Sequence, residues 1–256
     1  MAARQVQRQP KPANLPDAPM VQSKPYHATV LSILESMSAQ RVLDAPCGTG
    51  WLGQSLARKG SGATVDGMGL WEFPGKDDGY RNVQEHDLDQ PLPPAQETYD
   101  AIVCGEAIHL LTSPGVLLDG FARYLRPGGR VVITTPNTWN LRSRLQYLLR
   151  GFHSGFSPMI GKRRGHDYIT YFPWTYPQLH LLLTHFGYQD ITIHEVDEPK
   201  PKHAIEHLLA LPSKFYLSHR RKRSATAEEN SYWEQAATSQ SLHGRWLVVS
   251  ALAPST

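Results

Sequence analysis

Cysteine is scarce in this chain, which has two among 256 residues. Two cysteines are too few for a disulfide framework or a multi-cysteine zinc site. No apolar run approaches the roughly 20 residues that a membrane-spanning helix needs. The first 24 residues also lack the apolar core of a secretory signal. We therefore expect a cytoplasmic protein in a reducing compartment.

The chain has little excess charge of either sign. Its formal net charge is +3, and hydrophobic residues make up 40% of its composition. This charge is too small to indicate nucleic-acid binding by itself, and no basic, aromatic-rich strand pattern of the kind that reads single-stranded RNA is present. The length suits one domain with a large core. We expect a disordered segment over 1–24 and a single domain over 25–256.

Short apolar runs alternate with helical patterns along the chain. Strands are predicted over 41–45, 63–68, 83–86, 100–104, 131–135, 191–196 and 246–252, and helices over 30–37, 51–59, 113–125 and 175–186. Such alternation predicts an α/β fold, a doubly wound and mostly parallel seven-stranded sheet with helices on both faces. Two long insertions interrupt the pattern, at 137–173 after the fifth strand and at 197–244 between the last two.

The most informative stretch is 41–50, Arg-Val-Leu-Asp-Ala-Pro-Cys-Gly-Thr-Gly. A short strand ends in Asp44, a loop with Gly48 and Gly50 follows, and a helix begins at Trp51. Glycines allow the backbone to approach a ligand, and a helix start offers free N–H groups. The stretch therefore predicts a nucleotide-binding loop at the carboxyl end of a strand.

This loop resembles the first motif of class I S-adenosylmethionine-dependent methyltransferases, in which an acidic residue precedes Gly-x-Gly-x-Gly. Pro46 occupies the place of the first glycine. The segments 87–93, 99–106 and 125–129 resemble later motifs of the same family. Segments 135–137 and 140–151 resemble a bacterial branch of sugar- and polysaccharide-modifying and MetW-like methyltransferases. The resemblance covers about 41–196 and implies a Rossmann-like methyltransferase fold with S-adenosylmethionine as its cofactor.

The resemblance also implies roles for single residues. Four of them would line the methionine part of the cofactor: Asp44, Cys47, Gly48 and Gly50. Asp87 would reach the adenine amino group, with Leu88 packed beside it. Cys104 and Glu106 would flank the sulfonium end. The cysteines are also typical small, half-buried residues, and we expect packing and backbone roles from them.

The second strand departs from the family pattern. Relatives end this strand with an acidic residue that accepts both ribose hydroxyls, whereas Gly69 stands here. Asp66 comes three residues earlier and would point to the opposite face. Glu72 could reach back from the following loop. Loss of a bidentate acceptor would cost about 1.5–3 kcal/mol of cofactor binding.

Methylation of a hydroxyl requires a base, and histidine suits that role near neutral pH. His166 is the first candidate because Asp167 and Tyr168 accompany it, and His109 is the second. Each could equally be a hydrogen-bonded structural histidine. We assign Asn137, Arg142 and Tyr168 to acceptor binding, since arginine is suited to a phosphate or carboxylate. A solvated loop is the alternative for the arginines.

In the second insertion, apolar residues of 203–217 lead into the basic run 219–223. This combination suits the surface of a membrane, an acidic partner or nucleic acid, and a solvated helix end is the alternative. The sequence thus allows a membrane-peripheral protein.

We interpret the chain as a class I methyltransferase that methylates oxygen on a small hydroxylated acceptor, such as a sugar or lipid-linked glycan. A degenerate methyltransferase fold that acts as a binding or assembly subunit is one alternative. An enzyme that acts on RNA or protein is another. The sequence does not fix the acceptor or the oligomeric state.

Overall fold

The computed structural model describes residues 23–70, 73–75, 78–156, 172–201 and 204–254. Its strands are β1 (Arg41–Asp44), β2 (Thr64–Gly69), β3 (Tyr80–Glu85), β4 (Tyr99–Gly105), β5 (Leu125–Pro136), β6 (Gln189–Ile193) and β7 (Trp246–Leu252). Its helices are α1 (Tyr26–Ser36), α2 (Trp51–Lys59), α3 (Pro114–Tyr124), α4 (Leu141–Arg150), α5 (Tyr176–His185), α6 (Ala204–Lys222), α7 (Ala227–Ala236) and α8 (Ser239–His243).

The strands form one seven-stranded sheet in the order β3-β2-β1-β4-β5-β7-β6. All neighbouring pairs are parallel except those of β7, which runs antiparallel to both β5 and β6. Strand order reverses between β1 and β4, where ligands bind in sheets of this kind. The predicted doubly wound, mostly parallel α/β fold is therefore confirmed.

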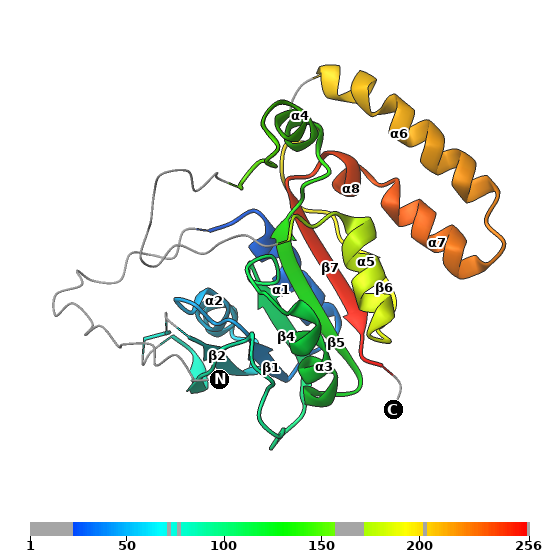
Figure 1. Ribbon diagram of the computed structural model, residues 1–256. Helices are drawn as coiled ribbons and strands as arrows, with labels where there is room; N and C mark the ends of the chain where they lie inside the picture. Colours follow the sequence, from blue (N-terminus) through cyan, green and yellow to red (C-terminus); the bar gives the residue numbers. More distant parts are fainter. Residues whose placement is uncertain (1–22, 71–72, 76–77, 157–171, 202–203, 255–256) are drawn as a thin grey trace, which may run out of the picture.

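Alternate residues of the central strands feed two separate cores. Val42 and Val132 pack with α1 and α2 on one face of the sheet, and Leu43 and Ile133 pack with α3 and α5 on the other. This alternation follows from the pleat, which points successive side chains to opposite faces. Both faces are covered by helices (Figure 1), as a mostly parallel sheet requires.

α5 begins where the Thr-Tyr-Pro-Gln sequence at 175–178 predicts a capping box. Thr175 accepts a hydrogen bond from the Gln178 backbone, and the Gln178 side chain accepts one from the Thr175 backbone, which completes a capping box. α3 also begins where predicted, with Ser113 at its N-cap and Pro114 in its first turn, but the Ser113 side chain makes no capping bond. Asp89 accepts hydrogen bonds from the Thr112 and Ser113 backbones instead.

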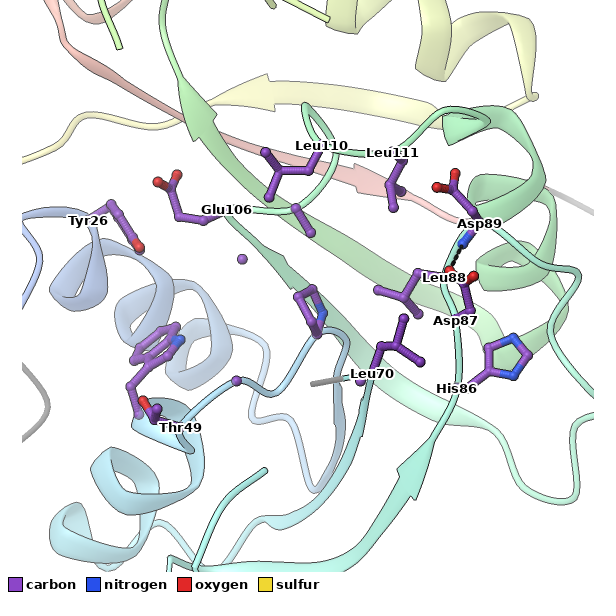
Figure 2. Close-up of a pocket in the computed structure, with 16 residues that line it drawn as sticks. Tyr26, Thr49, Leu70, His86, Asp87, Leu88, Asp89, Glu106, Leu110 and Leu111 are labelled. Atoms are coloured by element: carbon purple, nitrogen blue, oxygen red, sulfur yellow. Dashed lines mark hydrogen bonds between the residues drawn. The ribbon is translucent and has the colours of Figure 1, made fainter. Parts of the chain in front are cut away.

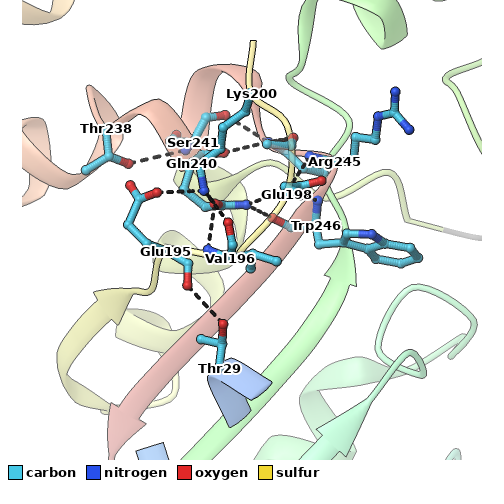
Figure 3. A network of polar contacts seen from close by, with 12 residues as sticks. Thr29, Glu195, Val196, Glu198, Lys200, Thr238, Gln240, Ser241, Arg245 and Trp246 are labelled. Atoms are coloured by element: carbon cyan, nitrogen blue, oxygen red, sulfur yellow. Dashed lines mark hydrogen bonds and ion pairs between the residues drawn. The ribbon is translucent and has the colours of Figure 1, made fainter. Parts of the chain in front are cut away.

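The second insertion contains α6, α7 and α8, and α6 and α7 form a hairpin beside the sheet (Figure 1). The side chain of Gln240, in α8, binds the backbone on both sides of this insertion. The side-chain Oε1 accepts a hydrogen bond from the Val196 backbone at 2.9 Å, and Nε2 donates to the Trp246 carbonyl at 2.7 Å (Figure 3). The first insertion contains α4. No helix in the described ranges has the length and apolar content needed to cross a membrane.

Candidate functional site

A cavity of about 330 Å³ opens at the carboxyl ends of β1, β2 and β4 (Figure 2). This volume is within the range of small-molecule sites, about 300–1,000 Å³. Figure 2 shows Tyr26 and Glu106 at one end and the stretch from His86 to Asp89 at the other. The remaining lining residues are Pro46, Gly48, Thr49, Trp51, Gly69, Leu70, Gly105, Ala107, Leu110 and Leu111.

The glycine-rich loop between β1 and α2 forms one wall. The Cys47 backbone N–H donates to the Met68 carbonyl at 2.9 Å, which fixes the loop to β2. Gly48 lines the cavity at φ +48°, in the left-handed region that favours glycine. Gly50, at φ +86°, does not line the cavity; a Cβ there would lie 2.9 Å from that of Pro74. Gly48 therefore faces the cavity, whereas Gly50 lies against Pro74.

Asp44 is completely buried where β1 ends. Its Oδ2 accepts a hydrogen bond from the Tyr80 hydroxyl at 2.6 Å, whereas its Oδ1 is buried without a hydrogen-bond partner. Burial raises the pKa of Asp44 to about 7, and the Tyr80 hydrogen bond opposes this rise. Asp44 stands next to the loop but does not itself line the cavity.

Glu106 follows β4 and points into the cavity (Figure 2). Its backbone is held at φ +55°, where the N–H donates to the Thr134 carbonyl at 3.0 Å. The side-chain Oε1 is buried without a hydrogen-bond partner. Burial raises the pKa of Glu106 to about 7, with a smaller opposing effect from Lys24. Because buried polar atoms are normally paired, this oxygen is a candidate contact for a molecule bound in the cavity.

Asp87, Leu88 and Asp89 line the far end of the cavity. Asp87 Oδ1 accepts a hydrogen bond from the Asp89 backbone at 3.0 Å. Asp89 in turn fixes the approach to α3 through its backbone contacts with Thr112 and Ser113. The predicted adenine-binding pair, Asp87 and Leu88, is therefore held on a rigid loop at the cavity.

Cys47 and Cys104 are both fully buried free thiols. Burial, with a smaller contribution from Asp44, raises the pKa of each to about 12. Both are therefore protonated at neutral pH, and neither lines the cavity. These positions give the cysteines packing and backbone roles in this fold.

Gly69 lines the cavity at the position where the family resemblance implies a ribose-binding acid, and its carbonyl accepts a hydrogen bond from the His86 backbone at 2.8 Å. Asp66 lies on another side of β2, where it accepts hydrogen bonds from Arg81 Nε and the Tyr99 hydroxyl, both at 3.0 Å. Asp66 therefore does not replace the missing acid. Glu72 lies outside the described residues.

His109 is buried behind the cavity wall and does not line the cavity. Its Nδ1 lies 3.1 Å from Thr135 Oγ1, and burial lowers the pKa of the imidazole to about 4. These features are typical of a structural histidine, and a catalytic role for His109 stays a prediction. His166 and Tyr168 lie outside the described residues.

Asn137 is buried, and its amide Nδ2 donates to the carbonyls of Gln240, Ser241 and Gly244. Its Oδ1 accepts a hydrogen bond from the Trp139 backbone. These contacts join the end of β5 to α8 and use the whole amide, so the structure gives Asn137 a structural role in place of the expected acceptor contact. Arg142 is exposed on α4 and does not line the cavity.

Several cavity residues carry no motif in the sequence. Tyr26 comes from α1, ahead of the first strand, and its ring meets Trp51 edge-on with centroids 6.5 Å apart. Burial raises the pKa of Tyr26, so its hydroxyl stays protonated and can donate. Tyr80, which binds Asp44 and does not itself line the cavity, carries no sequence motif either. Only their aromatic character beside the strands could have signalled them.

Residues 137–156 and 172–173 of the first insertion do not line the cavity. The insertion returns beside it, because the Phe172 N–H donates to the His109 carbonyl at 3.3 Å. Leu110 and Leu111, which follow His109, are lining residues. A cap over the cavity would have to come from 157–171, outside the described residues.

The chemistry of the cavity fits S-adenosylmethionine. The cofactor carries an ammonium and a sulfonium, and Glu106, which lines the cavity, has a buried carboxylate oxygen without a hydrogen-bond partner. Gly48 leaves the loop wall free of a side chain, and Asp87 and Leu88 provide an acid and an apolar surface at the other end. Glu106 and the Gly48 wall would hold the methionine part, and Asp87 with Leu88 the adenine.

Comparisons with known proteins agree with this fit. The family model described as "Methyltransferase domain" matches residues 4–193, well over half of the chain. A ubiquinone biosynthesis O-methyltransferase of Xylella fastidiosa (strain M23) is 32% identical over 133 residues, covering 48% of this chain and 52% of its own. A protein of the same name from Dechloromonas aromatica (strain RCB) is 28% identical over 147 residues, covering 53% and 60%. The chain spans about half the length of the curated relatives it matches.

Solved structures share the fold at low sequence identity. A chain in the Haloferax volcanii complex that contains the Trm112 methyltransferase activator matches with a TM-score of 0.51 and 17% identity, covering 90% of both chains. A protein of Bacillus halodurans C-125 matches with a TM-score of 0.51 and 14% identity, covering 90% of this chain and 99% of its own. Together with the family match, these findings establish that the chain belongs to the methyltransferase domain family and has the fold of its solved neighbours.

Proposed function

We propose that the enzyme methylates a hydroxyl oxygen of a small acceptor, such as a sugar or a lipid-linked glycan. The observation that carries the proposal is Glu106, which lines the cavity where β4 ends and has a carboxylate oxygen, Oε1, without a hydrogen-bond partner; this carboxylate would hold the cationic end of the cofactor. The acceptor would then approach from the side on which the 137–173 insertion returns to the loop after β4. Oxygen as the target atom is supported by the name of the curated relatives. The sugar class rests on the motif resemblance over 135–151.

The bound cofactor supplies an electrophilic methyl group. The protein must align the acceptor oxygen with that carbon, exclude water and remove the hydroxyl proton. We assign proton removal to His166. The rings of Tyr26 and Trp51 and the side chains of Leu110 and Leu111 form the apolar part of the enclosure.

A second acceptor is a hydroxylated intermediate of ubiquinone biosynthesis, which the name of the curated relatives favours. The two proposals differ in the molecule that gains the methyl group. The purified chain is incubated with isotope-labelled S-adenosylmethionine and either sugars and lipid-linked glycans or phenolic quinone precursors. Label in the sugar fraction supports the first proposal, and label only in the phenolic fraction supports the second. Label on neither class, with the cofactor bound, would contradict both.

Glu106→Gln is expected to weaken S-adenosylmethionine binding by about tenfold to 150-fold, because a hydrogen bond to a charged group contributes about 1.5–3 kcal/mol. Calorimetry with both S-adenosylmethionine and its demethylated product locates the contact. A loss confined to S-adenosylmethionine would place the carboxylate at the sulfonium. An equal loss for both ligands would place it at the ammonium. Unchanged affinity for both would remove Glu106 from the cofactor site.

The same carboxylate predicts a pH dependence. Above pH 7 Glu106 is ionised and attracts the cationic cofactor, and as the pH falls through about 7 it becomes protonated and affinity declines. Binding should therefore weaken by up to about tenfold per pH unit below 7. In Glu106→Gln this slope should become shallower, and any remaining slope is expected from Asp44, whose pKa is also about 7. A wild-type affinity that is constant from pH 8 to 6 would contradict this expectation.

A further inference from the structure

Two helices outside the cavity expose large apolar side chains to solvent. On α4, the exposed fractions of Leu148 and Leu149 are 79% and 83%, and on α6 those of Leu208 and Phe215 are 64% and 77%. The two helices touch, since Arg144 Nη1 donates to Ser213 Oγ at 3.0 Å, and Figure 1 shows α4 beside the start of α6. We call the outer faces of these helices the α4–α6 surface.

The apolar residues of α6 are on its outer side. Ala210 and Leu217, seven positions apart, face inward and are buried. At about 100° per residue, the exposed apolar side chains fall within about half of the helix circumference, on the opposite side. They are Ile205, Leu208, Leu209, Leu211, Phe215 and Tyr216. A surface helix normally presents polar residues there, so this face is built for contact.

Apart from Glu206 in the first turn of α6, the charged residues of α4 and α6 are all lysine or arginine. The stretches 137–156 and 207–223 contain no aspartate or glutamate, but three arginines and five lysines or arginines respectively. Arg220 and Arg221 are paired with Glu229 and Glu234 of α7, at 3.8 and 3.0 Å. Lys222 and Arg223 have no ion pair with any residue that the structure describes, which leaves their charges available at the end of α6.

We propose that the α4–α6 surface docks on an anionic membrane. Helices that lie at a bilayer interface combine outward apolar side chains with lysine and arginine, which is the combination found here. Cationic residues attract anionic headgroups, and no carboxylate in these two stretches opposes them. A second copy of the chain would bring like charges of the two surfaces together.

The test is sedimentation of the full chain with vesicles of phosphatidylcholine alone or mixed with phosphatidylglycerol. The wild-type protein should partition at least about tenfold more strongly onto the anionic vesicles, and added salt should weaken this binding. Leu208→Ser with Phe215→Ser should reduce the partition by about tenfold or more. Lys222→Gln with Arg223→Gln should reduce it by up to about fivefold for each charge, on anionic vesicles only.

Matched control variants test whether the loss of vesicle binding is specific to this surface or follows from changing any exposed residue. Leu181, on α5, is as exposed as Leu208, and Arg58 is an exposed cation on α2. Leu181→Ser and Arg58→Gln should leave vesicle binding unchanged, and calorimetry should show that all variants still bind S-adenosylmethionine. Equal losses in the control variants would overturn the proposal, as would wild-type protein that stays in solution with anionic vesicles at low salt. In another outcome, the wild-type protein is a dimer that does not bind vesicles, and Leu208→Ser with Phe215→Ser makes it monomeric. This result would assign the surface to a second copy of the chain.

Discussion

Gly48→Val is expected to raise the dissociation constant for S-adenosylmethionine by at least about 100-fold, a loss of about 2.7 kcal/mol or more. Gly48 lines the cavity at φ +48°, a conformation that a β-branched residue adopts only with strain. The new side chain would also fill the loop wall against which the cofactor lies. Isothermal titration of the purified variant measures the effect, and turnover should fall at subsaturating cofactor.

Gly60→Val is the matched control for this change. Gly60 ends α2 at φ +65°, and a Cβ there would meet no atom within 4 Å. The control variant therefore carries comparable backbone strain without a side chain in the cavity. It should lose thermal stability but keep its cofactor affinity. If both variants lost affinity equally, the effect would belong to the fold and the assignment of Gly48 to the cradle would be wrong.

His166→Ala is expected to lower kcat by about 10²–10⁴-fold, the usual contribution of a general base, and to leave cofactor affinity nearly unchanged. The motivation is the polar sequence around His166 and the return of its insertion to the cavity through the Phe172–His109 backbone bond. Methyl transfer to a saturating acceptor and cofactor titration measure the two effects separately.

His109→Ala and His185→Ala are the comparisons. His185 is exposed at the end of α5 and should have no effect on kcat or stability. His109 is buried with its pKa lowered to about 4, so its replacement should lower the melting temperature more than it lowers kcat. An unchanged kcat in His166→Ala together with a large loss in His109→Ala would transfer the base role to His109.

Much of the fold is visible in the sequence because its elements are marked locally. The bounds of α2 and β7 agree with the predicted 51–59 and 246–252. The start of β3 was predicted three residues late, since Tyr80 enters the sheet only by pairing with β2. Likewise β5 extends back to Leu125, because Leu125, ahead of the Arg-Pro-Gly-Gly segment, pairs with Tyr99 of β4. Tertiary pairing decided these bounds, and local patterns do not contain it.

The residues of the site also separate into those placed by local sequence and those placed by tertiary packing. The glycine-rich loop and the Asp87 segment can be read from spacing because short chain segments build them. Tyr26 and Tyr80 cannot, since they reach the cavity and Asp44 from elements whose positions depend on the finished sheet. The same limit applies to Asn137, whose amide is used by α8 about a hundred residues away. A motif locates a binding loop, but packing determines which side chains join it.

The position of β7 has a consequence for how the protein is made. β7 lies between β5 and β6 in the sheet although it follows both in the chain. While the ribosome is still translating the codons before residue 246, β5 has a bare edge, and β6 has no strand to pair with. Three helices, α6 to α8, are synthesised during this interval, and the core that they share with β7 stays incomplete until β7 is made. The nascent chain thus carries an open sheet edge, the kind of surface that holdase chaperones protect, until β7 inserts and joins the two halves.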